Sequence, residues 1–239
     1  MDDGPARIGN HLLAALPRET FALFGQDLKH VSLAQGIVCY EAGDRIDRVY
    51  FPISGMISLL VTGRDGKTIE TGVIGREGGA GLQSGLGERN SYTRATIQIP
   101  GHFGVIAAAH FERAVSDSAS LRDWVIHYLE AQCAEAQQIA ACNAIHSGSA
   151  RLCRWLLQAA ECTGSDHLPL TQEILADMIG VRRTTVTLLA QELQRRGVIR
   201  YSRGRITLLN RSMLEGCACE CYETIKRENQ KNGVNSVTV

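Results

Sequence analysis

The chain has 239 residues, no net charge at neutral pH, a hydrophobic fraction of 44% and eight cysteines. No apolar run approaches the ~20 residues that span a bilayer, and the acidic start lacks the apolar core of a signal peptide. We therefore expect a cytoplasmic protein with no membrane partner, with reduced thiols and with room for two modest domains.

The neutral total hides an uneven distribution of charge. Residues 1–146 carry 12 basic and 16 acidic side chains, whereas residues 147–211 carry 10 basic and 5 acidic ones. A basic segment is what a polyanion-binding module needs, because neutralising phosphates supplies most of the nonspecific affinity for nucleic acid.

The first half of the chain has the pattern of a β-domain. Residues 10–29 are predicted to form short helices. Short apolar runs separated by glycine turns then follow at intervals of about ten residues, which is typical of a barrel or sandwich. The runs are VSLAQG, IVCYEAGD, RVYFPISG, MISLLVTG, TIETGVIG, RATIQIPG and GVIAAAHF. The sequence predicts an α+β protein whose residues 1–117 form an antiparallel, jelly-roll-like β-roll.

A long helix follows, in residues 118–146. From Leu121 to Asn143 the apolar residues recur with helical periodicity, and small residues dominate the later part. A helix of this length between two domains either buries its stripe against a symmetry mate, as a dimerisation helix, or packs on the β-domain. His146 to Ser149 are predicted to form a hinge.

Residues 147–222 are predicted to form a winged helix-turn-helix domain. Thr171 is the expected N-cap of the first helix, and Gly180 suits the turn that follows it. A second helix is expected at about 182–196, with Val186, Ala190 and other residues as its buried stripe. A hairpin across Ser202-Arg203-Gly204 completes the wing, and residues 223–239 are expected to be a flexible tail.

The outward face of the second helix and the wing supply the predicted contacts with double-stranded DNA. The helix would meet base edges in the major groove, and the wing would hold the phosphates. The helix residues are Arg182, Arg183, Thr184, Thr187, Leu188 and Gln191, and the wing residues are Arg200, Arg203 and Arg205.

Three stretches give the chain a family resemblance: YEAGDRIDRVYFPISGMISL (40–59), RLCRWLL (151–157) and LTQEILADMIGVRRTTVTLLAQELQRRGVIRYSRGRI (170–206). With the order of elements, they resemble the Crp/Fnr family of bacterial transcription regulators. The resemblance implies a homodimer that reads a palindromic operator, with RNA polymerase as a further partner if it activates. No nucleophile–base pair, Walker loop or other catalytic motif stands in the sequence, so we predict that it is not an enzyme.

The family's cyclic nucleotide cassette is depleted in this sequence. Members that bind cyclic AMP carry Gly-Glu, and about ten residues later Arg followed by Ser or Thr. Here Arg89 can replace the phosphate arginine, but Gly79 and Asn90 replace the glutamate and the hydroxyl. The candidate effector residues are Glu77, Gly78, Gly79, Arg89 and Asn90. We predict no control by cyclic AMP and no cofactor; the alternative is a regulator responsive to a cyclic nucleotide.

The cysteines are candidate ligands for a metal ion or an iron–sulfur cluster. One cysteine lies in the first 130 residues, which excludes the N-terminal four-thiolate cluster of oxygen-sensing members. Cys217, Cys219 and Cys221 form a dense group, but a metal normally takes four ligands and no fourth is nearby in sequence. We predict no metal, with a redox or metal role as the alternative. His127 and His146 are the best-placed haem candidates, yet each is expected to be an ordinary surface or core residue.

The operator is expected to differ from those of well-known members. Those members use a Glu, a Ser or Gly, and an Arg where this chain has Thr184, Thr187 and Leu188. The acid that accepts from cytosine and the arginine that reads guanine are missing. A nonspecific architectural DNA-binding protein is the rival from another functional class.

Overall fold

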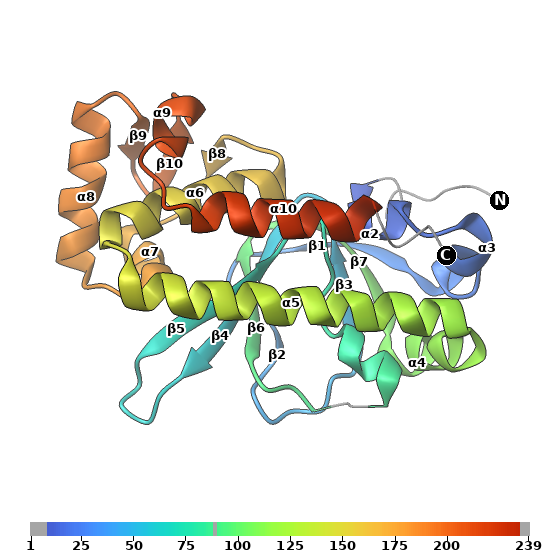
Figure 1. Cartoon of the computed structure of the whole chain (residues 1–239). Coiled ribbons are helices and arrows are strands. Elements are labelled where there is room, and N and C mark those ends of the chain that lie inside the picture. The colour runs from blue at the N-terminus through green and yellow to red at the C-terminus, as the bar shows by residue number, and fades with distance from the viewer. Residues whose placement is uncertain (1–8, 88–89, 235–239) are drawn as a thin grey trace.

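The computed structural model describes residues 9–87 and 90–234 (Figure 1). An N-terminal β-domain is followed by a long helix and by a C-terminal helical domain that carries a small sheet. None of the described helices is both long and apolar enough to cross a membrane. The predicted α+β class is confirmed.

Two antiparallel sheets form the β-domain, with strand orders β1-β7-β3 and β2-β6-β4-β5. Ile57 and Ile97 from one sheet and Phe103 and Val105 from the other meet in a shared core, which confirms the predicted β-roll. The strands are β1 (Lys29–Leu33), β2 (Val38–Tyr40), β3 (Arg48–Pro52), β4 (Met56–Thr62), β5 (Thr68–Ile74), β6 (Arg94–Ile99) and β7 (Gly101–Ala107).

Short helices surround the β-roll, and one of them corrects the sequence prediction. The run GVIAAAHF (104–111) was predicted as a strand, but β7 stops at Ala107 and helix α4 (Ala108–Asp117) begins at the next residue. Alanine favours a helix, and Phe111 and Val115, one turn apart, are both fully buried. The other short helices are α2 (His11–Ala14), α3 (Arg18–Ala22), η1 (Gly25–Asp27) and η2 (Leu82–Leu86).

Helix α5 (Ala119–Ile145) is the 27-residue helix predicted from the periodicity. Its N-cap is Ser118, whose hydroxyl accepts from the Leu121 N–H at 3.2 Å. Trp124 and Val125 of the apolar stripe are buried against the β-domain, so the chain itself covers the stripe. The opposite, solvent-exposed face carries other residues: Ile126, Glu130, Cys133, Ala134, Gln137, Ala140, Ala141, Ala144 and Ile145.

The C-terminal domain has the predicted winged helix-turn-helix order. A three-stranded antiparallel sheet, β8-β10-β9, packs beside its helices. Its core includes Trp155, Leu156, Leu175 and Leu193, all at most 2% exposed. The elements are α6 (Gly148–Thr163), β8 (His167–Leu168), α7 (Gln172–Ile179), α8 (Arg183–Arg195), β9 (Ile199–Ser202), β10 (Arg205–Leu208) and α9 (Arg211–Glu215).

The two domains share one hydrophobic core. Met56 of β4 and Val73 of β5 belong to the same buried cluster as Trp155 and Met178 of the C-terminal domain. Polar contacts cross the junction as well, because the Trp155 indole N–H donates to Glu70 Oε1 at 2.5 Å. The C-terminal domain is therefore docked on the β4–β5 face of the β-roll.

The flexible tail predicted for residues 223–239 needs correction. Residues Cys221–Val234 form helix α10, which runs antiparallel along α5 (Figure 1). Tyr222 and Ile225 are both 2% exposed, and the Tyr222 hydroxyl donates to Glu161 at 2.6 Å. The segment looks polar because only a few residues provide the buried side. The predicted tail residues 235–239 lie outside the described residues.

Candidate functional site

Helices α7 and α8 form the helix-turn-helix unit. The Thr171 hydroxyl caps α7 by accepting from the Ile174 N–H at 3.3 Å, and Gly180 ends the helix with a φ of +63°, a conformation that favours glycine. Val186 and Leu193 of α8 are buried in the domain core. These contacts fix which face of α8 points outward.

That outward face carries most of the residues predicted to read DNA. Arg182, Arg183, Thr184 and Gln191 are exposed, and Leu188 is 67% exposed, which is unusual for so large an apolar side chain. An arginine pair, a hydroxyl, an amide and an alkyl group therefore project together from the first three turns. This set can donate to guanine or phosphate, bond with adenine and contact a thymine methyl.

Thr187 differs from its predicted role as a free base contact. It is half-buried, and its hydroxyl donates to Oε1 of Gln172 at 2.7 Å. The Thr187 hydroxyl also lies 3.1 Å from the Arg183 carbonyl. Gln172 begins α7, so this bond joins the two helices. The role of Gln172 was not predictable from the sequence, because a residue beside an N-cap carries no pattern that links it to a helix fifteen positions further on.

The wing is a tight hairpin that gathers arginines. Arg203 and Gly204 occupy the turn with φ values of +48° and +71°, as the two-residue turn of a twisted hairpin requires. Arg200, Arg203 and Arg205 line a 460 Å³ surface hollow together with hydroxyl side chains of the same hairpin. Positive charge and hydroxyl groups in one hollow suit a phosphate.

A direct hydrogen bond holds the wing to α8. The backbone N–H of Tyr201 donates to Oε1 of Gln194 on α8 at 2.8 Å. Base-reading and phosphate-holding residues therefore lie on one connected unit.

The candidate effector residues of the β-roll are occupied by the protein itself. The Gly79 N–H donates to the Tyr128 hydroxyl of α5 at 2.9 Å. A Cβ at Gly78 would collide with the same hydroxyl, so only glycine fits there. Asn90 is exposed, and its backbone pairs with that of Arg45 in an isolated antiparallel β-bridge. Arg89 lies outside the described residues.

The Glu77 carboxylate is hydrogen-bonded within the protein. Its carboxylate accepts from the Gly75 N–H at 2.6 Å, and the Cys162 thiol of α6 lies 3.5 Å away. Desolvation raises the pKa of the Glu77 carboxyl, although these hydrogen bonds oppose the shift. Glu77 therefore belongs to the junction between the domains.

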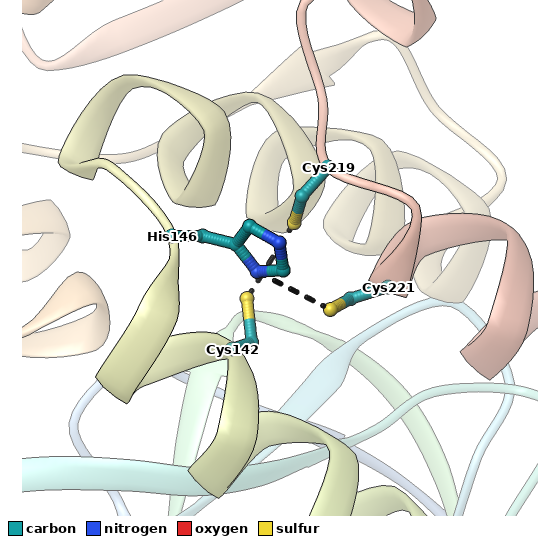
Figure 2. A group of neighbouring side chains, drawn as sticks. All are labelled: Cys142, His146, Cys219 and Cys221. Atoms are coloured by element: carbon teal, nitrogen blue, oxygen red, sulfur yellow. Dashed lines mark hydrogen bonds between the residues drawn. The ribbon is translucent and has the colours of Figure 1, made fainter.

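The three C-terminal cysteines do not all lie together in the structure. Cys219 and Cys221 lie beside Cys142 and His146 at the end of α5 (Figure 2), whereas Cys217 packs against the core of the C-terminal domain. Cys142 and His146, which are not nearby in sequence, therefore bring two further candidate ligands to Cys219 and Cys221. The two pairs are far apart in sequence, so spacing alone did not reveal them.

These two domains define a class of protein: a regulator in which a cyclic-nucleotide-type β-roll is joined to a winged helix-turn-helix. Residues 30–118 match the model of the cyclic nucleotide-binding domain, and residues 150–217 match the model of the Crp-like helix-turn-helix domain. The chain belongs to the Crp/Fnr family and is a DNA-binding transcription regulator, not an enzyme. No curated protein matches its sequence.

Solved structures share the fold at low sequence identity. FixK2 from Bradyrhizobium japonicum is 15% identical, with a TM-score of 0.68 over 80% of this chain and 98% of its own. The c-di-GMP-responsive regulator CLP from Xanthomonas campestris is 16% identical, with a TM-score of 0.64 over 81% and 100%. A Crp/Fnr-family regulator from Eubacterium rectale is 20% identical, with a TM-score of 0.64 over 90% and 97%.

Proposed function

We propose that this protein acts as a cytoplasmic homodimer on a near-palindromic operator, without control by cyclic AMP. The observation that carries the proposal is the outward face of α8, where Arg182, Arg183, Thr184, Leu188 and Gln191 are exposed together opposite a buried stripe. These residues meet base edges, and the wing arginines hold the backbone.

The exposed face of α5 supports the dimer. Ile126 and Ile145 are 38% and 71% exposed at the two ends of this face, and Ala134 and Ala141 lie exposed between them. Small residues let two helices approach closely, and the exposed isoleucines gain burial from pairing. Two protomers related by a two-fold axis present two α8 helices, so the operator halves repeat about one DNA turn apart.

The β-roll supports independence from cyclic AMP. Tyr128 occupies the Gly79 N–H, and the glycine segment lacks the acid and the hydroxyl of the cyclic AMP cassette. A nucleotide would have to displace a buried hydrogen bond without gaining the usual partners. RNA polymerase is the further partner at promoters where the protein activates transcription.

A selection from random DNA duplexes tests the proposal. Purified full-length protein should enrich a two-fold symmetric sequence, and the complex should contain two protomers by light scattering. The proposal would be overturned if no sequence were enriched or if the complex contained a single protomer. The absence of any enriched sequence would favour a nonspecific architectural protein. The Arg64→Asn variant, changed at an exposed turn of the β-roll, is the matched control and should select the same sequence.

A further inference from the structure

Four potential metal ligands converge at the junction between α5 and α10. Cys142 lies in the last turn of α5 and His146 is its C-cap, while Cys219 lies in the link between α9 and α10 and Cys221 is the first residue of α10. Their sulfur and nitrogen atoms all lie within 4.8 Å of one another (Figure 2). Three thiols and one imidazole at this separation form a complete ligand set for one metal ion.

The local backbone explains why these side chains point toward a common centre. Cys142 and His146 are four residues apart, so they share one face of α5. Cys219 and Cys221 are two residues apart where the chain enters α10, and both turn toward α5 (Figure 2). The three cysteines are at most 7% exposed, and the His146 side chain is 17% exposed. The set is therefore shielded from water.

The distances fit a small tetrahedral ion. The Cys142 and Cys219 sulfurs are 3.5 Å apart, and the Cys221 sulfur is 3.5 Å from Nδ1 of His146. Tetrahedral zinc, with bonds of about 2.3 Å to sulfur and about 2.0 Å to nitrogen, places its ligand atoms about 3.5–3.8 Å apart. We propose that Cys142, His146, Cys219 and Cys221 bind one zinc ion.

Neighbouring groups orient the ligands. Nε2 of His146 lies 3.1 Å from the Glu220 carboxylate, which holds the proton on Nε2 and leaves Nδ1 free to coordinate. A carboxylate behind a ligating histidine is a recurrent arrangement in zinc proteins. On the opposite side, Gln138 donates from Nε2 to the Cys221 sulfur at 3.0 Å, a bond that favours a thiolate.

The charge balance also suits this ligand set. Zinc binding releases three thiol protons, so the ion with three thiolates and a neutral imidazole carries one net negative charge. Arg154 of α6 is 2% exposed and lies about one helical turn from Ala150, which packs against the three cysteines. Its Nε has no hydrogen-bond partner within the described part of the chain. A buried guanidinium beside the site offsets the negative complex.

Two other chemistries fit less well. A disulfide would require the Cys142 and Cys219 sulfurs to approach to about 2.05 Å, and it would leave Cys221 and the orientation of His146 unexplained. An iron–sulfur cubane spreads its ligands over four separate metal atoms. That geometry needs a wider set than one confined within 4.8 Å.

The position of the site indicates that a bound ion would link α5 to α10. His146 is the first residue of the hinge that leads from α5 into α6, Cys219 lies just before α10, and Cys221 is the first residue of α10. A bound ion therefore fastens the end of α5 to the start of α10, across the connection to the DNA-binding domain. The affinity for DNA becomes sensitive to zinc through the orientation of this hinge.

Metal analysis of the full-length protein tests the proposal without reference to DNA. Protein purified without chelator should contain about one zinc per protomer. Cys219→Ser and Cys221→Ser should reduce the content to below about a tenth of that value. Cys217→Ser and Cys133→Ser are matched controls, one from the same segment and one from exposed α5, and both should keep the ion. Glu220→Ala should weaken zinc binding about tenfold.

Spectroscopy of the unmodified protein covers the case in which a variant does not fold. The zinc X-ray absorption spectrum should fit three sulfurs at about 2.3 Å and one nitrogen at about 2.0 Å. Cobalt exchanged into the site should give the intense thiolate charge-transfer bands of a tetrahedral complex. No zinc and no cobalt bands, a Cys142–Cys219 disulfide in the fresh protein, or iron with acid-labile sulfide would each overturn the proposal.

Discussion

The Tyr128 hydroxyl of α5 accepts a hydrogen bond at 2.9 Å from the backbone N–H of Gly79 in the β-roll. Both residues are buried, so the bond ties the glycine segment of the β-roll to the long helix.

Removing this hydroxyl should destabilise the protein. Tyr128→Phe leaves the Gly79 N–H buried without an acceptor, which costs about 1–3 kcal/mol. Urea denaturation should show that loss in the free energy of unfolding, and calorimetry should show no cyclic AMP binding before or after the change. Tyr92→Phe, at a side chain that is 78% exposed, should change neither quantity. A saturable cyclic AMP isotherm for the unmodified protein would contradict the assignment.

The start of α8 should carry sequence reading. Arg183→Ala removes an exposed guanidinium at the first residue of the helix, and we expect it to abolish specific binding, because losing a contact worth about 1–3 kcal/mol in each half-site brings the affinity near the nonspecific level. Band-shift titrations against the selected operator and an unrelated duplex measure this change, and the dimer should persist by light scattering. Unchanged operator affinity would refute the assignment of Arg183.

The wing should contribute mainly to salt dependence. Arg203 sits in the turn at a φ of +48°, and Asn tolerates that conformation, so Arg203→Asn removes the charge while keeping the hairpin. The slope of log affinity against log salt should fall by about 0.9 per protomer, with operator preference unchanged. Arg64→Asn, in the β4–β5 turn, is the control. An unaltered slope for Arg203→Asn would remove this residue from the phosphate contacts.

Stability should fall as the pH rises from weakly acidic to neutral. Glu70 accepts from Ser58 and Trp155 at 2.6 and 2.5 Å, but its burial raises the pKa from 4.5 to about 7. Below pH 4.5 both the folded and the unfolded chain hold the proton; between 4.5 and 7 only the folded chain does. Stability is therefore lost as the pH rises through that interval.

Glu70→Gln should remove the part of this pH dependence that Glu70 contributes, whereas buried Glu135, whose pKa is raised to about 8 by desolvation and by the neighbouring Glu77, should keep contributing its own part. One pKa unit corresponds to about 1.4 kcal/mol, so the buried charge costs about 3 kcal/mol at pH 8. Chemical denaturation at pH 5 and pH 8 should show the variant gaining stability relative to the parent at the higher pH. Glu215→Gln, at an exposed position on α9, is the control. Parallel pH profiles for the parent and Glu70→Gln would contradict the prediction.

The sequence predicted those parts of the fold that depend on local patterns. Caps and turn glycines such as Thr171 and Gly180 placed α7 and α8, and the 3.6-residue period placed α5. It failed at Ala107, where the alternation of a strand and the alanines of a helix overlap. It also failed at α10, because Tyr222 and Ile225 are buried by α5 and α6, which no local pattern reveals.

The residues of the candidate sites show the same difference between local patterns, which the sequence reveals, and long-range contacts, which it does not. The DNA-reading face of α8 was predictable, because exposure on a helix follows from its buried stripe. Long-range convergence was not: Thr187 bonds to Gln172, and Cys142 lies beside Cys219. Such pairs depend on how helices dock, and one sequence carries no direct record of that. The homodimer, the operator and the absence of cyclic AMP control remain predictions.

The course of α10 along α5 has a consequence for how the protein matures. A ribosome releases α5 well before α10 has been made, so the nascent chain exposes Cys142 and the neighbouring side of α5 until α10 has emerged. Once α10 has formed, it packs against α5 and α6 and so fixes the two domains together. A transcript truncated before residue 219 would yield a chain with a complete β-roll and winged domain but an open flank, which protein quality control can recognise.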